Sequence, residues 1–249
     1  MKKIIVANWK MNTGSTEAES LVKKIIKGLG LYKDKEIIIC PPFMWLSLVR
    51  DLLNKKSLKL GAQNVYFEDK GSFTGEISPL MLKEIAEYVI IGHSERRRFL
   101  HENDEMINKK VQASLKSGLK PIVCVGEFEK NNTSQENELY GNIFHQLTQA
   151  IAGVSGEKMA EVIVAYEPVW AIGSGTPATV KYVSEIVNSL RDRLAIIYNR
   201  EIAQKVKILY GGSVDSSNVG EFFKEKDING VLVGGASLKA EEFIKICKS

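Results

Sequence analysis

Eight short apolar runs, each followed by a longer segment, are the feature that most constrains the fold of this chain. The runs are continuous stretches of Ile, Val and Leu rather than alternating ones, which is typical of parallel strands covered by helices. We predict strands at residues 4–9, 36–40, 58–62, 88–92, 121–125, 162–167, 206–210 and 230–233.

The segments between these runs have the periodicity of amphipathic helices. Apolar side chains recur at three- and four-residue spacing in residues 16–29, 102–117, 135–152 and 180–198. The pattern indicates a βα unit repeated eight times. No linker rich in Pro, Gly or Ser interrupts it, and 249 residues over eight units leave about 31 for each, close to the size of one unit. We predict that residues 1–249 form a single α/β domain.

Composition and charge exclude several classes of protein. The chain is 44% apolar and 26% charged, as a compact domain is and a disordered or collagen-like chain is not. The uncharged stretches at residues 37–49 and 168–180 have 13 residues each and contain prolines, whereas a membrane span needs about 20 apolar residues. The net charge of +4 arises from basic and acidic residues mixed along the sequence, and we expect Arg96-Arg97-Arg98 to form local ion pairs. Neither a membrane nor a nucleic acid is an expected partner.

The cysteines and the first residues bear on the location of the protein. Cys40, Cys124 and Cys247 are odd in number and far apart, without a C-x-x-C motif, so we predict neither a disulfide framework nor a zinc site. The first apolar run is too short for the core of a secretory leader. We expect a cytoplasmic protein whose cysteines are reduced.

Polar side chains gather just past the C-terminal ends of the predicted strands. They are Asn8, Lys10, Gln63, Asn64, His93, Glu95, Glu127, Glu167, Ser213, Gly234 and Gly235. In an open sheet the outer strands would lie roughly seven spacings of 4.8 Å apart, too far to share one substrate. In a closed (β/α)8 barrel these groups converge on the face where such barrels have their active sites. We therefore predict a closed barrel rather than a doubly wound sheet.

Lys10 and Asn8 stand two positions apart at the end of the first predicted strand, so strand alternation points both side chains the same way. A lysine at the end of a buried strand needs an anionic partner, which favours a role in binding a charged substrate. Taken alone, the pattern is also typical of a solvated lysine.

The sequence His93-Ser94-Glu95 lies at the turn between the fourth strand and the next helix. We expect Ser94 to cap that helix and the helix dipole to disfavour the imidazolium form of His93, leaving a neutral hydrogen-bond donor. A purely structural histidine fits the pattern equally well. A metal site of His93, Glu95 and His101 lacks an established ligand spacing, so we predict no metal.

Glu167 ends the very apolar sixth run and precedes Pro168, which favours an extended backbone at Glu167. An apolar surround favours protonation of a carboxylate, and this property suits a general base. The alternative is a glutamate that caps a helix or forms an ion pair.

The segment from Gly173 to Ala178 superficially matches the G-x-G-x-x-A pattern of dinucleotide binding. That pattern begins at the end of its strand, whereas five residues intervene here after Glu167, so we reject a nucleotide site. We predict instead a lid with hinged ends. It comprises Pro168, Val169, Trp170, Ala171, Ile172, Gly173, Ser174, Gly175, Thr176, Pro177 and Ala178.

Glycine pairs follow the last two predicted strands. Gly211-Gly212-Ser213 and Gly234-Gly235 offer backbone N–H groups that no side chain obstructs, which is the local chemistry of a phosphate site. Glycines are common in tight turns, but two pairs on consecutive strands of a barrel favour phosphate binding.

Four motifs spread over the full length of the chain resemble those of the triosephosphate isomerase family, whose members are TIM barrels. They are Asn8-Trp9-Lys10-Met11-Asn12, Gly92-His93-Ser94-Glu95-Arg96-Arg97, Tyr166-Glu167-Pro168-Val169-Trp170-Ala171-Ile172-Gly173 and Tyr210-Gly211-Gly212-Ser213-Val214. The resemblance implies a glycolytic and gluconeogenic isomerase that interconverts dihydroxyacetone phosphate and D-glyceraldehyde 3-phosphate through an enediolate, without metal or cofactor. The glutamate base and neutral histidine electrophile of this family are a standard example of proton transfer beside a carbonyl.

The resemblance also implies a role for each matched residue. Glu167 would be the base and His93 the electrophile. Lys10 and Asn8 would contact substrate oxygens, and Glu95 would be an accessory carboxylate. Phosphate would be held at Gly173, Ser213, Gly234 and Gly235. The lid reads Gly-Ser-Gly-Thr-Pro-Ala where the family has Gly-Thr-Gly-Lys-Thr-Ala, a departure that concerns the hinge rather than the chemistry.

A loop at residues 65–78 is more apolar than a solvated loop usually is, so we expect it to be covered. In the resembling family this loop inserts beside the first strand of a twin subunit. The resemblance therefore implies a homodimer in which Thr74 of one chain braces Lys10 of the other and Met11 lies at the interface.

Two other functions remain open at this point. A Schiff-base aldolase on the same barrel would use Lys10 as its nucleophile and would need that lysine shielded and largely neutral. A non-catalytic phosphate-binding protein would keep the barrel, although the presence of Glu167, His93 and Lys10 together favours an enzyme.

Overall fold

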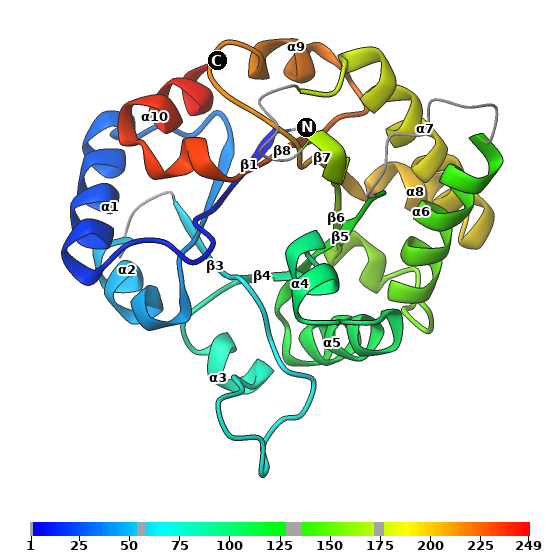
Figure 1. Cartoon of the computed structure of the whole chain (residues 1–249), viewed down its shortest axis with the longest axis horizontal. Helices are drawn as coiled ribbons and strands as arrows, with labels where there is room; N and C mark the ends of the chain where they lie inside the picture. The colour runs from blue at the N-terminus through cyan, green and yellow to red at the C-terminus, as the bar shows by residue number, and fades with distance from the viewer. Residues whose placement is uncertain (1, 54–57, 128–135, 172–176) are drawn as a thin grey trace.

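In the computed structural model, eight parallel strands form a closed barrel surrounded by helices (Figure 1). The structure describes residues 2–53, 58–127, 136–171 and 177–249. The strands are β1 (Ile4–Asn8), β2 (Glu36–Cys40), β3 (Lys59–Ala62), β4 (Tyr88–Ile91), β5 (Lys120–Val125), β6 (Ile163–Tyr166), β7 (Lys207–Tyr210) and β8 (Gly230–Val233). They follow one another in chain order, and β8 pairs with β1. The predicted TIM barrel is confirmed, and each predicted strand differs from the observed one by at most one residue at either end.

Helices cover the outside of the barrel (Figure 1). The α-helices of the described ranges are α1 (Ser15–Leu29), α2 (Leu46–Leu53), α3 (Pro79–Lys83), α4 (Ser94–Phe99), α5 (Asp104–Ser117), α6 (Glu136–Ala150), α7 (Val180–Ile197), α8 (Arg200–Lys205), α9 (Val219–Lys224) and α10 (Ala240–Lys248). Shorter 3₁₀ helices are η1 (Phe43–Trp45), η2 (Lys158–Glu161), η3 (Val169–Ala171) and η4 (Gly235–Leu238). Helix α5 begins two residues later than predicted because the side chain of Asn103 caps it, accepting a hydrogen bond from the Met106 amide.

Both faces of every strand are buried, which explains the continuous apolar runs. Along β1, Ile5 and Ala7 pack under the helices, whereas Ile4 and Val6 face the barrel interior. The interior is a separate apolar cluster of Ile4, Val6, Ile38, Cys40, Tyr88, Ile90, Ile122, Cys124, Ile163, Ala165, Leu209 and Leu232. The barrel is thus a filled core, and the strand ends above it are left for the site.

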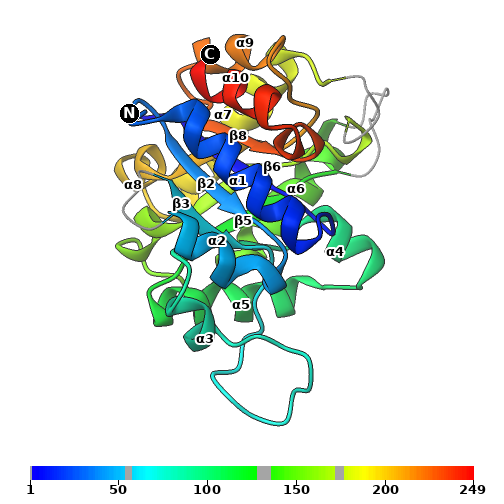
Figure 2. The same ribbon diagram turned by 90° about the vertical axis from the view of Figure 1, so that its left-hand side faces the viewer.

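The connection between β3 and α3 projects away from the body of the barrel (Figure 2). Aromatic side chains pack on one another within it, since the rings of Tyr66 and Phe67 stack at 4.2 Å and Phe73 lies 4.7 Å from Tyr66. Phe73 is nevertheless 41% exposed. The loop that we expected to be covered is therefore only partly covered by its own chain.

Several other features bear on the expectations from the sequence. Arg96 and Arg97 form ion pairs with Glu102 and Asp104, as expected. The three cysteines are free and buried. Among the described residues, no helix has the length and apolar character that crossing a membrane requires. In the same part of the chain, no group of three or more His, Cys, Asp or Glu side chains is arranged to hold a metal ion.

Candidate active site

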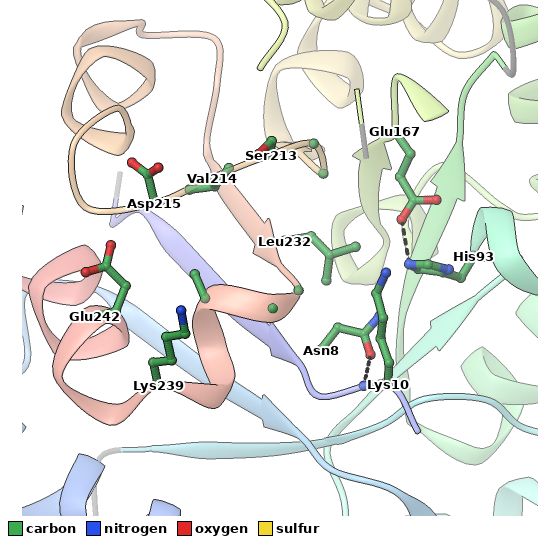
Figure 3. A pocket seen from close by; sticks show the side chains of 15 residues that line it. Asn8, Lys10, His93, Glu167, Ser213, Val214, Asp215, Leu232, Lys239 and Glu242 are labelled. Carbon is green, nitrogen blue, oxygen red and sulfur yellow. Dashed lines mark hydrogen bonds and ion pairs between the residues drawn. The ribbon is translucent and has the colours of Figure 1, made fainter. Parts of the chain in front are cut away.

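A cavity of about 470 Å³ opens at the C-terminal ends of the strands (Figure 3). The residues that the sequence assigned to chemistry and phosphate binding line it together: Asn8, Lys10, His93, Glu167, Ser213, Gly234 and Gly235. Glu95 joins this group through an ion pair between its Oε1 atom and Lys10 Nζ, at 2.6 Å. Side chains that are up to 227 positions apart in the sequence are therefore neighbours in space, because the closed barrel brings β8 next to β1.

Lys10 has a left-handed backbone, with φ of 54°. Its amide donates a 3.0 Å hydrogen bond to Asn8 Oδ1, at the end of β1. A Cβ atom on Gly234 would lie 3.3 Å from Lys10 Cε and 3.8 Å from Nζ. The ammonium group therefore lies beside the glycine pair that follows β8, where it adds positive charge to a site for an anion.

His93 rather than Ser94 caps helix α4, so the predicted cap is wrong. The Nδ1 atom of His93 accepts a 3.2 Å hydrogen bond from the Glu95 amide, while Ser94 is already the first helical residue. Because Nδ1 accepts from the backbone, Nε2 is the ring nitrogen that is left to donate a hydrogen bond to a substrate. The role of His93 as a neutral donor stays a prediction.

Glu167 follows β6 and is 1% exposed. Its Oε2 atom accepts a 2.9 Å hydrogen bond from the Ser94 amide. Its Oε1 atom is buried and lies 3.1 Å from His93 Nε2, within ion-pair distance (Figure 3). Because Glu167 also lines the cavity, its carboxylate is placed where a general base would meet a bound substrate.

Gly211 and Gly234 lie where a side chain would approach Glu167 and Lys10. A Cβ atom on Gly211 would lie only 2.9 Å from Glu167 Cγ. Gly212, Ser213, Gly234 and Gly235 line the same cavity, with η4 beginning at Gly235. The side chains of Lys10, His93 and Glu167 lie close together in the cavity, and the glycines after β7 and β8 line another part of it (Figure 3). A carboxylate, an imidazole, an ammonium group and glycine turns in one cavity suit removal of a proton next to a carbonyl in a phosphorylated substrate.

Comparison with known proteins decides the family. The profile of the family described as "Triosephosphate isomerase" matches residues 3–249. The chain belongs to the triosephosphate isomerase family. A curated triosephosphate isomerase from Caldanaerobacter subterraneus subsp. tengcongensis is 48% identical over 246 residues, covering 98% of this chain and 97% of the relative. One from Dictyoglomus thermophilum is 45% identical over 250 residues, covering 100% and 99%.

The predicted lid of this family member is described only at its two ends. Pro168 and η3 (Val169–Ala171) form the first end, and Pro177 and Ala178 the second. The Ala178 amide donates a 3.3 Å hydrogen bond to the hydroxyl of Tyr210, whose pKa burial raises to about 12. The other predicted lid residues, including the proposed phosphate ligand Gly173, lie outside the described residues: Ile172, Gly173, Ser174, Gly175 and Thr176.

Glu127 is a buried residue to which the sequence analysis assigned no role. Its Oε1 atom accepts hydrogen bonds from Tyr166 at 2.9 Å, Trp170 at 2.8 Å and Tyr182 at 3.1 Å. Burial raises the pKa of this carboxyl, against the opposing effect of the three donors. Glu127 is thus hydrogen-bonded to Tyr166, which directly precedes Glu167, and to Trp170, which follows it by three residues. The only signal in the sequence was its position after the fifth predicted strand.

The cavity also extends further than the sequence predicted. Asp215, Lys239 and Glu242 line its outer part (Figure 3). Asp215 Oδ1 accepts from the amides of Ser217 and Asn218. Asp215 follows β7, Lys239 lies between η4 and α10, and Glu242 is in the first turn of α10. None of them was assigned a role from the sequence.

Proposed function

We propose that Glu167, His93 and Lys10 carry out the reaction of this family, the interconversion of dihydroxyacetone phosphate and D-glyceraldehyde 3-phosphate. The observation that carries the assignment is the pair of atoms Glu167 Oε1 and His93 Nε2, which face each other in a cavity that Lys10 also lines. A triose phosphate bound there would have its carbon chain between base and imidazole and its phosphate at the glycines after β7 and β8.

The reaction then needs only proton transfers. Glu167 takes a proton from the carbon next to the carbonyl, and the electron pair of that C–H bond forms the enediolate. The Nε2–H group of His93 hydrogen-bonds to the oxygens where negative charge develops, and the ammonium of Lys10 stabilises the same charge. A proton passes from the hydroxyl oxygen that becomes the new carbonyl to the original carbonyl oxygen, by way of Nε2 of His93, and Glu167 returns its proton to the neighbouring carbon. These two transfers complete the isomerisation without metal or cofactor.

Glu95 and Asn8 support Lys10 in this scheme. The side chain of Lys10 forms an ion pair with Glu95, which suits an electrostatic role better than that of a Schiff-base nucleophile. Borohydride added with substrate should therefore leave the protein unmodified. A covalent adduct at Lys10 would support the aldolase instead.

The proposal is tested by following the substrate protons. The purified protein, assayed in a chelator, should isomerise both triose phosphates and incorporate solvent deuterium at the carbon that receives the proton. Isomerisation without any deuterium incorporation, or activity that disappears in the chelator, would contradict the assignment.

We also propose that the protein is a homodimer built around the loop at residues 65–78. The projecting loop, the 41% exposure of Phe73 and the 97% exposure of Met11 support a covered surface here. In the family arrangement, Thr74 of one chain would brace Lys10 of the other. Light scattering should show a dimer that Met11→Asp disrupts, whereas Leu31→Asp, at another exposed apolar residue, should leave it intact. A fully active monomer at nanomolar concentration would contradict the proposal.

Two further proposals concern the whole chain. The packing of the described helices around one barrel supports a single domain over residues 1–249. Three buried free cysteines support a reducing compartment, and we propose the cytoplasm. Limited proteolysis that released a stable fragment would contradict the single domain, and fractionation of cells tests the location.

A further inference from the structure

The backbone of Lys10 is strained, and the strain lies in the residue that carries the positive charge of the site. Its φ of 54° is in the left-handed region, which residues with a Cβ atom rarely adopt. Such a conformation persists only where the surroundings impose it. The groups that hold Lys10 in place therefore decide where its ammonium points.

Gln63 is the side chain that reaches this backbone from another strand. Its Nε2 atom donates hydrogen bonds of 2.9 Å to the carbonyl oxygen of Lys10 and of 2.9 Å to that of Cys40. Gln63 directly follows β3, Cys40 ends β2, and Lys10 follows β1. The Gln63 amide group thus uses its two hydrogens to bond to residues at the ends of β1 and β2, while Gln63 itself follows β3.

We propose that Gln63 is a positioning residue that holds Lys10 in its left-handed conformation and so aims the ammonium at Glu95 and at the glycines after β8. The proposal rests on the role given above to Lys10. Without Gln63, the Lys10 carbonyl loses its donor, and the backbone relaxes toward an ordinary conformation that turns the side chain away from the site.

The chemistry of this position favours an amide. Two carbonyl oxygens need two N–H donors from one side chain, which Gln supplies without a charge. Met has nearly the same length and no donor, and Glu has the same shape but offers only acceptors at neutral pH. Both substitutions keep the volume, so they separate the hydrogen bonds from the packing.

Gln63 also connects Lys10 to the projecting loop. The next residue, Asn64, is buried, and its Oδ1 atom accepts a 2.8 Å hydrogen bond from Lys110 on α5. The loop at residues 65–78 begins directly after this fixed pair. The Gln63 side chain therefore links the segment that directly precedes this loop to the Lys10 carbonyl.

The first experiment compares Gln63→Met with Gln112→Met. Gln112 also uses its amide for two hydrogen bonds, to Asn108 Oδ1 and the Ala152 carbonyl, but on the outer helix α5. We expect Gln63→Met to lower kcat/KM by about 10- to 100-fold, mainly through KM, as misplacement of a binding group does. Gln112→Met should stay within about twofold of wild type. The proposal would be overturned if Gln63→Met and Gln112→Met lowered kcat/KM equally, or if Gln63→Met left it unchanged.

A double-mutant cycle with Lys10→Met then shows whether Gln63 acts through Lys10. In the Lys10→Met background, Gln63→Met should cost less than about threefold more, because there is no ammonium left to misplace. If the fold-losses in kcat/KM of the two single variants multiply in the double variant, Gln63 acts independently of Lys10. That result would overturn the positioning role and leave the role of Lys10 intact. Wild-type kinetics in Lys10→Met would overturn both. If Gln63→Met does not fold, the isosteric Gln63→Glu takes its place in the same cycle, with the same expected outcomes.

Discussion

His93 Nε2 lies 3.1 Å from Glu167 Oε1, and both side chains are more than nine-tenths buried. In the mechanism that we propose, these two groups act on the same substrate, so little room is left between them for it. The Ser94 amide holds Glu167 in this position through a 2.9 Å hydrogen bond to Oε2. We expect binding of a triose phosphate to require a change in the orientation of the Glu167 side chain.

Replacing Glu167 by Gln keeps the shape of the side chain and removes the base. We expect kcat to fall by at least about 10²- to 10⁴-fold, the usual contribution of a general base, with a modest change in substrate affinity. Steady-state kinetics in both directions measures this, with Glu19→Gln, at a half-buried surface position on α1, as a control. Activity within threefold of wild type would mean that another group removes the proton.

Replacing Lys10 by Met removes the ammonium from the cavity. Charge-assisted hydrogen bonds contribute about 1.5–3 kcal/mol, so KM should rise by at least about tenfold. The exposed Lys24→Met on α1 controls for a general effect of lost charge. Unchanged KM and kcat in Lys10→Met would remove this residue from the site.

Deleting residues 172–175 tests the predicted lid. An enediolate beside a phosphate ester can eliminate inorganic phosphate, and a closed site prevents this by holding the phosphate out of the required geometry. We expect the deletion variant to retain part of its proton exchange while methylglyoxal and free phosphate become major products. NMR of the product mixture measures the partition. Loss of exchange and isomerisation together, with no methylglyoxal, would show that the lid is needed for the chemistry itself.

Glu102→Ala tests a buried ion pair outside the site. The side chains of Glu102 and Lys110 are each 2% exposed and are hydrogen-bonded to each other. Burial lowers the pKa of Lys110 and Glu102 opposes this, so removing Glu102 leaves an unpaired buried ammonium. We expect the free energy of unfolding to fall by about 3–5 kcal/mol. In urea unfolding, the double variant Glu102→Met with Lys110→Met should lose less, and an equal or larger loss would refute the explanation.

The buried thiol of Cys247 makes the free energy of unfolding depend on pH in the alkaline range. Burial raises the pKa of its thiol to about 12 from the ordinary value of 9.0. The resulting stabilisation is complete below pH 9 and is lost as the pH rises toward about 12, because only the unfolded thiol ionises in that range. At pH 10 one such group accounts for about 1.4 kcal/mol of the loss. Cys247→Ala should therefore lose less stability than wild type between pH 8 and pH 10 in urea unfolding, and equal losses would contradict this.

The strands were predictable because each of them buries both faces, which leaves a continuous apolar run in the sequence. The members of the site were predictable where they directly follow a strand, as Lys10, His93 and Glu167 do. The residue that caps α4 could not be predicted, because the choice between His93 and Ser94 depends on the direction in which the chain leaves β4. The partners of Gln63 and Glu127 were also missed, since they lie 23 to 55 positions away in the sequence.

The pairing of β1 with β8 joins the first strand of the barrel to the last. Without Gly230–Val233, β1 would have only β2 as a neighbour and would present an unpaired edge to other chains. Asn8, which ends β1, and Lys10, which follows it, line one cavity with Gly234 and Gly235. Loss of β8 would therefore expose an aggregation-prone edge and remove part of the site, so closure of the barrel protects against aggregation and completes the site in the same step.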